Sequence, residues 1–166
     1  LLKKAQKEGY AVGAFNANNM EIVQAIIETA EEEKAPVILQ ASQGAINYAG
    51  VDYITAIVKV ASEKASVPVS LHLDHGTDFN QVIKCIRAGF SSVMFDGSKL
   101  PLKDNITITK KIVEIAHPIE VSVEGELGKI GGVEDQVSVQ ALQATMTDPK
   151  EALEFVSQTG VDALAI

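Results

Sequence analysis

Apolar segments typical of strands alternate with amphipathic segments typical of helices along the whole chain. Between residues 20 and 34, Ile22, Val23, Ile26 and Ile27 recur at the spacing of one helix face. Further helices are expected at 51–66, 78–88, 102–116 and 148–159. Strands are expected at 10–16, 36–40, 67–73, 91–95 and 119–126, with a last one beginning at residue 161. The pattern therefore predicts five strand–helix units and the start of a sixth.

Strands that are apolar throughout and alternate with helices indicate a parallel sheet covered by helices. An open doubly wound sheet and a closed (β/α)8 TIM barrel share this α/β pattern. A barrel needs eight units and typically about 250 residues, so the chain would supply about its first five to six strands. It starts at Leu1 without a Met and stops inside the apolar run 161–166. We expect residues 1–166 to be a single domain, the N-terminal part of a barrel truncated chiefly at its C-terminus.

The composition is that of an ordinary globular protein with an acidic balance. Hydrophobic residues make up 46% and charged residues 22% of the 166 positions, and the net charge is −8. This charge argues against binding nucleic acid or an anionic membrane. No apolar run approaches the roughly 20 residues of a membrane span. The single cysteine, Cys85, allows no intrachain disulfide and reads as a core thiol, which fits a cytoplasmic location.

Polar or ionisable side chains follow the apolar strands in succession. They are Asn16, Ser42, Asp74 with His75, Asp96 and Glu126. Because the carboxyl ends of parallel strands meet at one edge, these side chains should converge where α/β folds bind their ligands. The sequence therefore predicts a functional rim along this edge.

The most informative part of this rim is the segment His72-Leu73-Asp74-His75. Alternate residues of a strand share a face, so His72 and Asp74 should point the same way, while His75 lies where the strand turns into its loop. A neutral imidazole is a common metal ligand, and an adjacent carboxylate can act as general acid and base. The alternative is a structural histidine beside an aspartate that caps a helix.

Asp96 and Glu126 are carboxylates that could be metal ligands, supporting groups or helix caps. A metal site of His75, Asp96 and Glu126 is conceivable, but catalytic zinc usually has three protein ligands and favours nitrogen donors. The chain has three histidines, and His117, before Pro118 at a predicted helix end, reads as structural. The residues alone leave the metal site open.

A long glycine-containing segment over 128–147 follows the fifth strand. A loop of about twenty residues inside a compact domain is usually functional, often a lid that excludes water. Glu134 on such a lid could be brought to a substrate. The alternative is a mobile surface loop with solvated acids.

Four segments, in this order and at these intervals, resemble the signatures of class II fructose-bisphosphate and tagatose-bisphosphate aldolases. They are Tyr10-Ala11-Val12-Gly13-Ala14-Phe15-Asn16, Leu71-His72-Leu73-Asp74-His75-Gly76, Val123-Glu124-Gly125-Glu126-Leu127-Gly128 and Gly131-Gly132-Val133-Glu134-Asp135. The resemblance covers nearly the whole chain. It implies a (β/α)8 barrel enzyme, a homodimer or homotetramer, that uses zinc to cleave a ketose bisphosphate to dihydroxyacetone phosphate and an aldehyde. The resemblance favours fructose 1,6-bisphosphate as the substrate.

The same resemblance implies roles for the rim. His75 matches the first zinc ligand, and Asp74 matches the acid/base that serves the C4 hydroxyl of the ketose. Asp96 and Glu126 match ligands of a second or alternative divalent position. The remaining two zinc histidines of the family lie on later strands, beyond Ile166, as do most of its phosphate-binding loops and its monovalent-cation site.

Further residues match by the same resemblance. Ser42 resembles the serine near the aldehyde part of the substrate, and Asn16 is expected to bind substrate as well. Glu134 resembles a lid glutamate that moves a proton, and His72 is expected only to support the site. Three readings stay open beside a fructose-bisphosphate aldolase: a tagatose-1,6-bisphosphate aldolase, a non-catalytic half-barrel fragment, and another metal-dependent barrel enzyme such as a hydrolase.

Overall fold

The computed structural model describes residues 1–128, 132–134, 137–139 and 146–166, and the side chains outside 129–145. The helices are α1 (Leu2–Glu8), α2 (Met20–Glu32), α3 (Gln43–Ala49), α4 (Val51–Lys64), α5 (Phe79–Ala88), α6 (Leu102–Ala116), the short 3-10 helix η1 (His117–Ile119) and α7 (Pro149–Thr159). The strands are β1 (Gly13–Asn16), β2 (Val37–Ser42), β3 (Val69–Gly76), β4 (Ser92–Phe95), β5 (Ser122–Glu126), β6 (Gly132–Glu134), β7 (Val137–Val139) and β8 (Ala163–Ala165).

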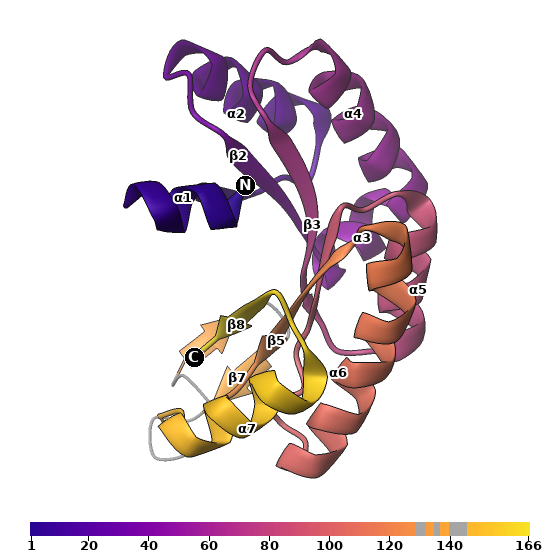
Figure 1. The fold of residues 1–166 in the computed structure, drawn as a ribbon. Helices are drawn as coiled ribbons and strands as arrows, with labels where there is room; N and C mark the ends of the chain where they lie inside the picture. Colours follow the sequence, from indigo (N-terminus) through magenta and orange to yellow (C-terminus); the bar gives the residue numbers. More distant parts are fainter. Residues whose placement is uncertain (129–131, 135–136, 140–145) are drawn as a thin grey trace.

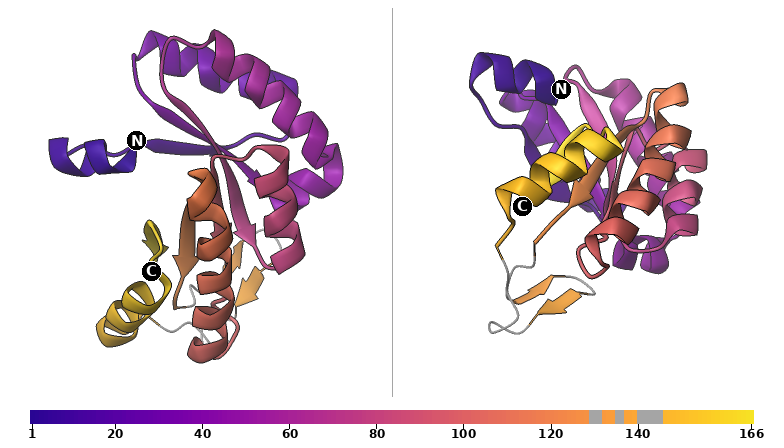
Figure 2. Two further views of the ribbon diagram at one scale, coloured as in Figure 1. Left: turned by 45° about the vertical axis from the view of Figure 1, so that its right-hand side comes forward. Right: turned by 60° about the horizontal axis from the view of Figure 1, so that its bottom comes forward.

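One six-stranded parallel sheet organises the fold, in the order β1-β2-β3-β4-β5-β8. The sheet curves, and α2, α4, α5 and α6 lie along its convex side (Figures 1 and 2). Neighbours in sequence are neighbours in the sheet, as in a barrel rather than in a doubly wound sheet. The predicted (β/α)8 half-barrel is therefore confirmed.

The core lies between the sheet and this layer of helices. Outward-pointing strand residues Leu39, Leu73, Val93 and Phe95 are at most 2% exposed. Each contributes about 1.5–3 kcal/mol through burial of its apolar surface. Cys85 of α5 is fully buried among them, and burial raises its thiol pKa to about 12. Its prediction as a core thiol is confirmed.

Capping residues fix where several helices begin. The side chains of Asn19, Asp78 and Asp148 accept hydrogen bonds from backbone N–H groups at the starts of α2, α5 and α7. Gly89 and Gly160 end α5 and α7 in the left-handed conformation. Of the helices described, none is long and apolar enough to cross a membrane.

The structure contains elements that the sequence pattern did not predict. Helix α1 precedes the first strand, and α3 follows β2 directly because the Ser42 side chain accepts a hydrogen bond from Ala45 N at 3.2 Å and so starts a helix. Within the segment expected to be an uninterrupted loop, β6 and β7 pair as an antiparallel hairpin. Strand boundaries also shift; β3 runs to Gly76 rather than to Leu73.

Close packing around Gly125 of β5 predicts a loss of stability when a larger residue is placed there. A Cβ atom at this position would lie 2.5 Å from Cε1 of Phe155, whose side chain is fully buried and has no space to withdraw. We expect Gly125→Ala to lower the free energy of unfolding of the full-length protein by about 1–3 kcal/mol, measured by urea denaturation. Ser122→Ala, on the exposed end of the same strand, should change it by less than about 0.5 kcal/mol. Equal effects would contradict this packing.

Candidate active site at the carboxyl rim

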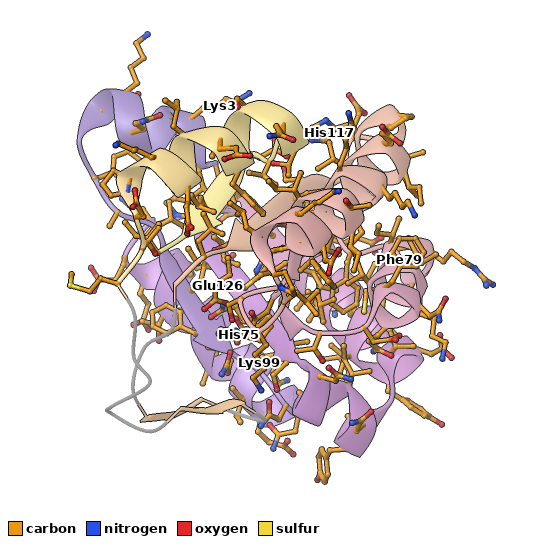
Figure 3. The ribbon with its side chains drawn as sticks, turned by 90° about the horizontal axis from the view of Figure 1, so that it is seen from below. Lys3, His75, Phe79, Lys99, His117 and Glu126 are labelled. Atoms are coloured by element: carbon orange, nitrogen blue, oxygen red, sulfur yellow. The ribbon has the colours of Figure 1, made fainter. Side chains whose placement is uncertain are left out.

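The carboxyl ends of the parallel strands bring the predicted side chains to one rim of the half-barrel. Asp74 and His75 lie near the end of β3, Asp96 directly follows β4, and Glu126 is the last residue of β5. Figure 3 shows His75 and Glu126 side by side, with His117 well apart from them. His117 instead bonds Asp162 at 3.0 Å, so its structural assignment is confirmed.

His75 is the centre of this rim. Its Nδ1 atom lies 3.3 Å from Oδ2 of Asp96 and 3.3 Å from Oε2 of Glu126. Its backbone has φ of 47°, in the left-handed region, and the pairing of β3 with β4 shifts register between Leu73 and Gly76. An irregularity of this kind re-aims a side chain at the end of a strand.

Glycine at position 76 permits this irregular end of β3. A Cβ atom there would lie 2.8 Å from the backbone oxygen of Met94, so β3 and β4 could not approach as they do. The approach allows the backbone N–H of Asp96 to bond the Gly76 carbonyl at 2.9 Å. This bond ties the aspartate to the strand that carries His75.

Asp96 is held in place by the residues that follow it. Its Oδ1 atom accepts hydrogen bonds from the Ser98 backbone N–H at 3.0 Å and from the Ser98 hydroxyl at 2.7 Å, which leaves Oδ2 toward His75. Burial raises the pKa of Asp96, but the hydrogen bonds with His75 and Ser98 outweigh it, and the pKa lies below its usual range. Asp96 is therefore a carboxylate at neutral pH.

Asp96 and Glu126 in turn raise the pKa of the His75 imidazole. Hydrogen bonds to Asp96 and then to Glu126 raise the pKa of His75 to about 11, against a smaller opposing effect of burial. Without a metal, the ring is thus a cation between two carboxylates. A divalent cation would replace the proton in the same electrostatic environment.

Asp74 lies beside this cluster and is oriented from the neighbouring strand. Its Oδ1 atom accepts a hydrogen bond from Nε2 of Gln40 at 3.0 Å and lies 4.0 Å from Nε2 of His75. Ser42 is its register partner on β2, and its hydroxyl, which caps α3, is mostly buried. The acid/base candidate and the serine therefore stand next to each other at the rim.

His72 faces the concave side of the sheet, as Asp74 does. Its Nδ1 atom lies 2.8 Å from the Ser92 hydroxyl, and Nε2 lies 3.5 Å from Oε2 of Glu124. Burial lowers the pKa of His72 to about 4. A neutral ring donates from one nitrogen and accepts at the other, so it can connect the hydroxyl and the carboxyl. The supporting role of His72 stays a prediction.

Two predicted residues remain to be placed, Asn16 and Glu134. Asn16 ends β1 at the same edge and is exposed. Glu134 ends the short strand β6, but its side chain lies outside the part that the structure describes. Gln40 and Ser98, which the sequence reasoning missed, hold Asp74 and Asp96 directly. The sequence signal for Gln40 was its polar side chain inside the apolar run of β2.

The donor set suits a divalent cation. One ligand atom from each of His75, Asp96 and Glu126 can be chosen so that all three lie within 4.8 Å of one another. Three protein ligands that mix imidazole and carboxylate leave room for a substrate, as in catalytic metal sites. The residues present therefore fit the metal that the sequence resemblance implies.

Comparison with known proteins gives the same picture. The family model described as fructose-bisphosphate aldolase class II matches residues 1–166. A fructose-bisphosphate aldolase of Thermus caldophilus is 49% identical over 166 residues, which are 100% of this chain and 54% of that protein. The D-tagatose-1,6-bisphosphate aldolase subunit GatY of Klebsiella oxytoca is 43% identical over 100% of this chain and 58% of its own. The chain spans about half the length of the curated relatives it matches.

Solved structures share the fold. The YdjI aldolase of Escherichia coli K12 matches with a TM-score of 0.85 and 33% identity, over 99% of this chain and 57% of its own. A fructose-1,6-bisphosphate aldolase, so described, of Coccidioides immitis matches with a TM-score of 0.88 and 32% identity, over 98% of this chain and 57% of its own.

Proposed function

Since the chain belongs to the class II fructose-bisphosphate aldolase family, we propose that the full-length protein reversibly cleaves fructose 1,6-bisphosphate to dihydroxyacetone phosphate and glyceraldehyde 3-phosphate, a step of glycolysis and gluconeogenesis. The observation that carries this proposal is the cluster of His75, Asp96 and Glu126 with Asp74 beside it. It combines a place for a Lewis acid with a carboxyl group of the kind that exchanges a proton with substrate.

In this proposal His75, Asp96 and Glu126 are ligands of Zn²⁺, His75 at the first divalent position and Asp96 with Glu126 at a second or alternative one. A monovalent cation is a further candidate for the site. A zinc ion bound there would polarise the ketose carbonyl as a Lewis acid. The carboxylates of Asp96 and Glu126 offset its charge. Their burial keeps them in a low-dielectric environment, where the attraction is stronger than in water.

Asp74 takes the proton of the C4 hydroxyl in the cleavage direction. The C3–C4 bond then breaks, its electron pair moves toward the carbonyl carbon, and the C4 oxygen becomes the aldehyde. Gln40 donates a hydrogen bond to Oδ1 of Asp74 and so orients the carboxyl group beside the metal cluster. Glu134 is proposed to return a proton to C3, and Ser42 and Asn16 to bind the substrate at the rim.

The substrate is tested by dihydroxyacetone phosphate release from fructose 1,6-bisphosphate and from tagatose 1,6-bisphosphate, using the full-length protein. The two ketoses differ only in configuration at C4, the carbon that Asp74 would serve. Faster release from the fructose derivative is the expected result. Faster release from the tagatose derivative would move the assignment to that substrate, the one in the name of the relative GatY. Release from neither, by folded and zinc-loaded protein, would refute an aldolase.

Metal binding should depend steeply on pH. The pKa of His75 is about 11 without metal, so its ring is protonated at neutral pH and must lose that proton to bind zinc. Zinc affinity should therefore rise about tenfold per pH unit between about pH 6 and pH 9, with one proton released per ion. Titration calorimetry in two buffers of different ionisation enthalpy measures that release. Zinc binding without proton release would contradict a protonated His75 ring in the metal-free protein.

The full-length protein is also proposed to be a cytoplasmic homodimer or homotetramer. Large apolar and aromatic side chains at the surface support association. Tyr48 of α3 and Tyr53 of α4 are 79% and 74% exposed. A sugar bisphosphate is the proposed small-molecule partner, and no nucleic acid or membrane is expected.

A further inference from the structure

A buried amide on α6 lies behind the rim. Asn105 is 1% exposed, on a helix face that buries mostly apolar residues such as Ile106 and Ile112. Asparagine is a poor residue for a helix interior, and a buried amide is unfavourable unless it is hydrogen-bonded. Burial alone would favour leucine at this position. The presence of an amide is therefore explained by the hydrogen bonds that it makes.

Those contacts reach the segment that carries Glu126. Nδ2 of Asn105 donates a hydrogen bond to the backbone oxygen of Glu126 at 2.9 Å. Oδ1 accepts one from the hydroxyl of Thr109, one turn later on α6, at 3.0 Å. Thr109 is fully buried as well. Its hydroxyl fixes which way the amide faces, so that Nδ2 and not Oδ1 meets the carbonyl.

The same amide also lies against the segment that carries Asp96. Gly97 is the next residue, and a Cβ atom there would overlap the carboxamide of Asn105. The backbone of Gly97 therefore packs directly on the amide. Asn105 thus touches the chain at one residue beyond Asp96 and at Glu126 itself, the two acids that flank His75.

We propose that Asn105 is a positioning residue that sets the separation of the Asp96 and Glu126 carboxylates for a divalent cation. The inference rests on the proposed function, because it requires that these two residues bind metal. Asn105 itself does not reach the cation or the substrate. It acts through the backbone of the two ligand segments, and groups that orient metal ligands typically change metal affinity by about 10–100-fold when replaced.

The test compares three variants of the full-length protein. Asn105→Leu keeps the γ-branched shape of the side chain, with a larger volume, and removes both hydrogen bonds. Thr109→Val keeps Asn105 but removes the hydroxyl that orients it. Thr107→Val is the matched control, since the Thr107 hydroxyl bonds a backbone oxygen on the exposed side of the same helix. Cobalt dissociation constants and the visible spectrum of the cobalt-loaded protein are measured, together with urea unfolding.

We expect Asn105→Leu to weaken cobalt binding at least about tenfold and to change the cobalt spectrum. Thr109→Val should show smaller changes in cobalt affinity and spectrum. It provides the test if the Asn105→Leu protein does not fold. Thr107→Val should match wild type. Unchanged affinity and spectrum in folded Asn105→Leu or Thr109→Val protein would overturn the role of Asn105 alone. Absence of cobalt binding by wild type would overturn the metal site, and this inference with it.

Discussion

Asp74→Asn is expected to lower kcat for cleavage of fructose 1,6-bisphosphate by about 10²–10⁴-fold, because an amide cannot take the proton of the C4 hydroxyl. Oδ1 remains available to Gln40, so the side chain should keep its position. Its oxygen lies 4.0 Å from His75 Nε2, close to the metal cluster but outside it. Zinc affinity should therefore change by less than about tenfold, well below the loss on removing a ligand. Steady-state rates and zinc affinity are measured on the same protein preparation.

Asp78→Asn is the matched control for this substitution. The residue lies four positions later, carries the same charge, and caps α5 through Gln81 N at 2.9 Å. Asparagine caps a helix as well as aspartate does, so its kcat should be that of wild type. An Asp74→Asn protein that retains wild-type kcat would remove Asp74 from the chemistry. Loss of zinc from the Asp74→Asn protein would show that Asp74 contributes to metal binding instead.

His75→Gln is expected to lower zinc affinity by more than about 100-fold, beyond the loss seen when only a supporting partner is removed. The substitution takes away the nitrogen donor and leaves Asp96 and Glu126 facing each other without the cation between them. Like charges at this distance repel, so the metal-free variant should also be less stable near neutral pH. Competition with a chromophoric chelator measures the affinity.

His117→Gln separates loss of this donor from loss of any histidine. His117 pairs with Asp162 away from the rim, so this variant should bind zinc as wild type does. If His75→Gln and His117→Gln bound zinc equally well, the cluster could not be the metal site. Together, the Asp74 and His75 variants distinguish a residue that moves protons from one that holds metal.

The fold was predictable because its signal is repeated. Each strand–helix unit shows the same alternation, and the apolar strands have few other ways to bury both faces. The convergence of Asp74, His75, Asp96 and Glu126 followed from one topological rule about the ends of parallel strands. A single unit would have been weak support, whereas successive units pointed to one rim.

Features that depend on local backbone geometry were not predictable in this way. The positive φ of His75 and the register shift beside it depend on how Gly76 meets Met94 on the next strand. Helix α3 begins because Ser42 is both the end of a strand and a cap, a dual role that periodicity does not show.

Supporting side chains were missed for a related reason. Asn105 lies in a helix that carries many other polar residues, and Gln40 interrupts the apolar run of its strand. A single polar residue in an apolar pattern has many explanations. Its partner, the Glu126 carbonyl in one case and the Asp74 carboxyl in the other, is distant in sequence. Only the three-dimensional arrangement shows which group each amide serves.

The rim cluster is proposed to make the full-length protein a metal-dependent aldolase. The most direct measurement follows dihydroxyacetone phosphate release from fructose 1,6-bisphosphate before chelation, after removal of metal, and after addition of zinc. Release that stops on chelation and returns with about one equivalent of zinc per chain is the predicted result. Release that continues in protein shown to be free of metal would contradict the claim.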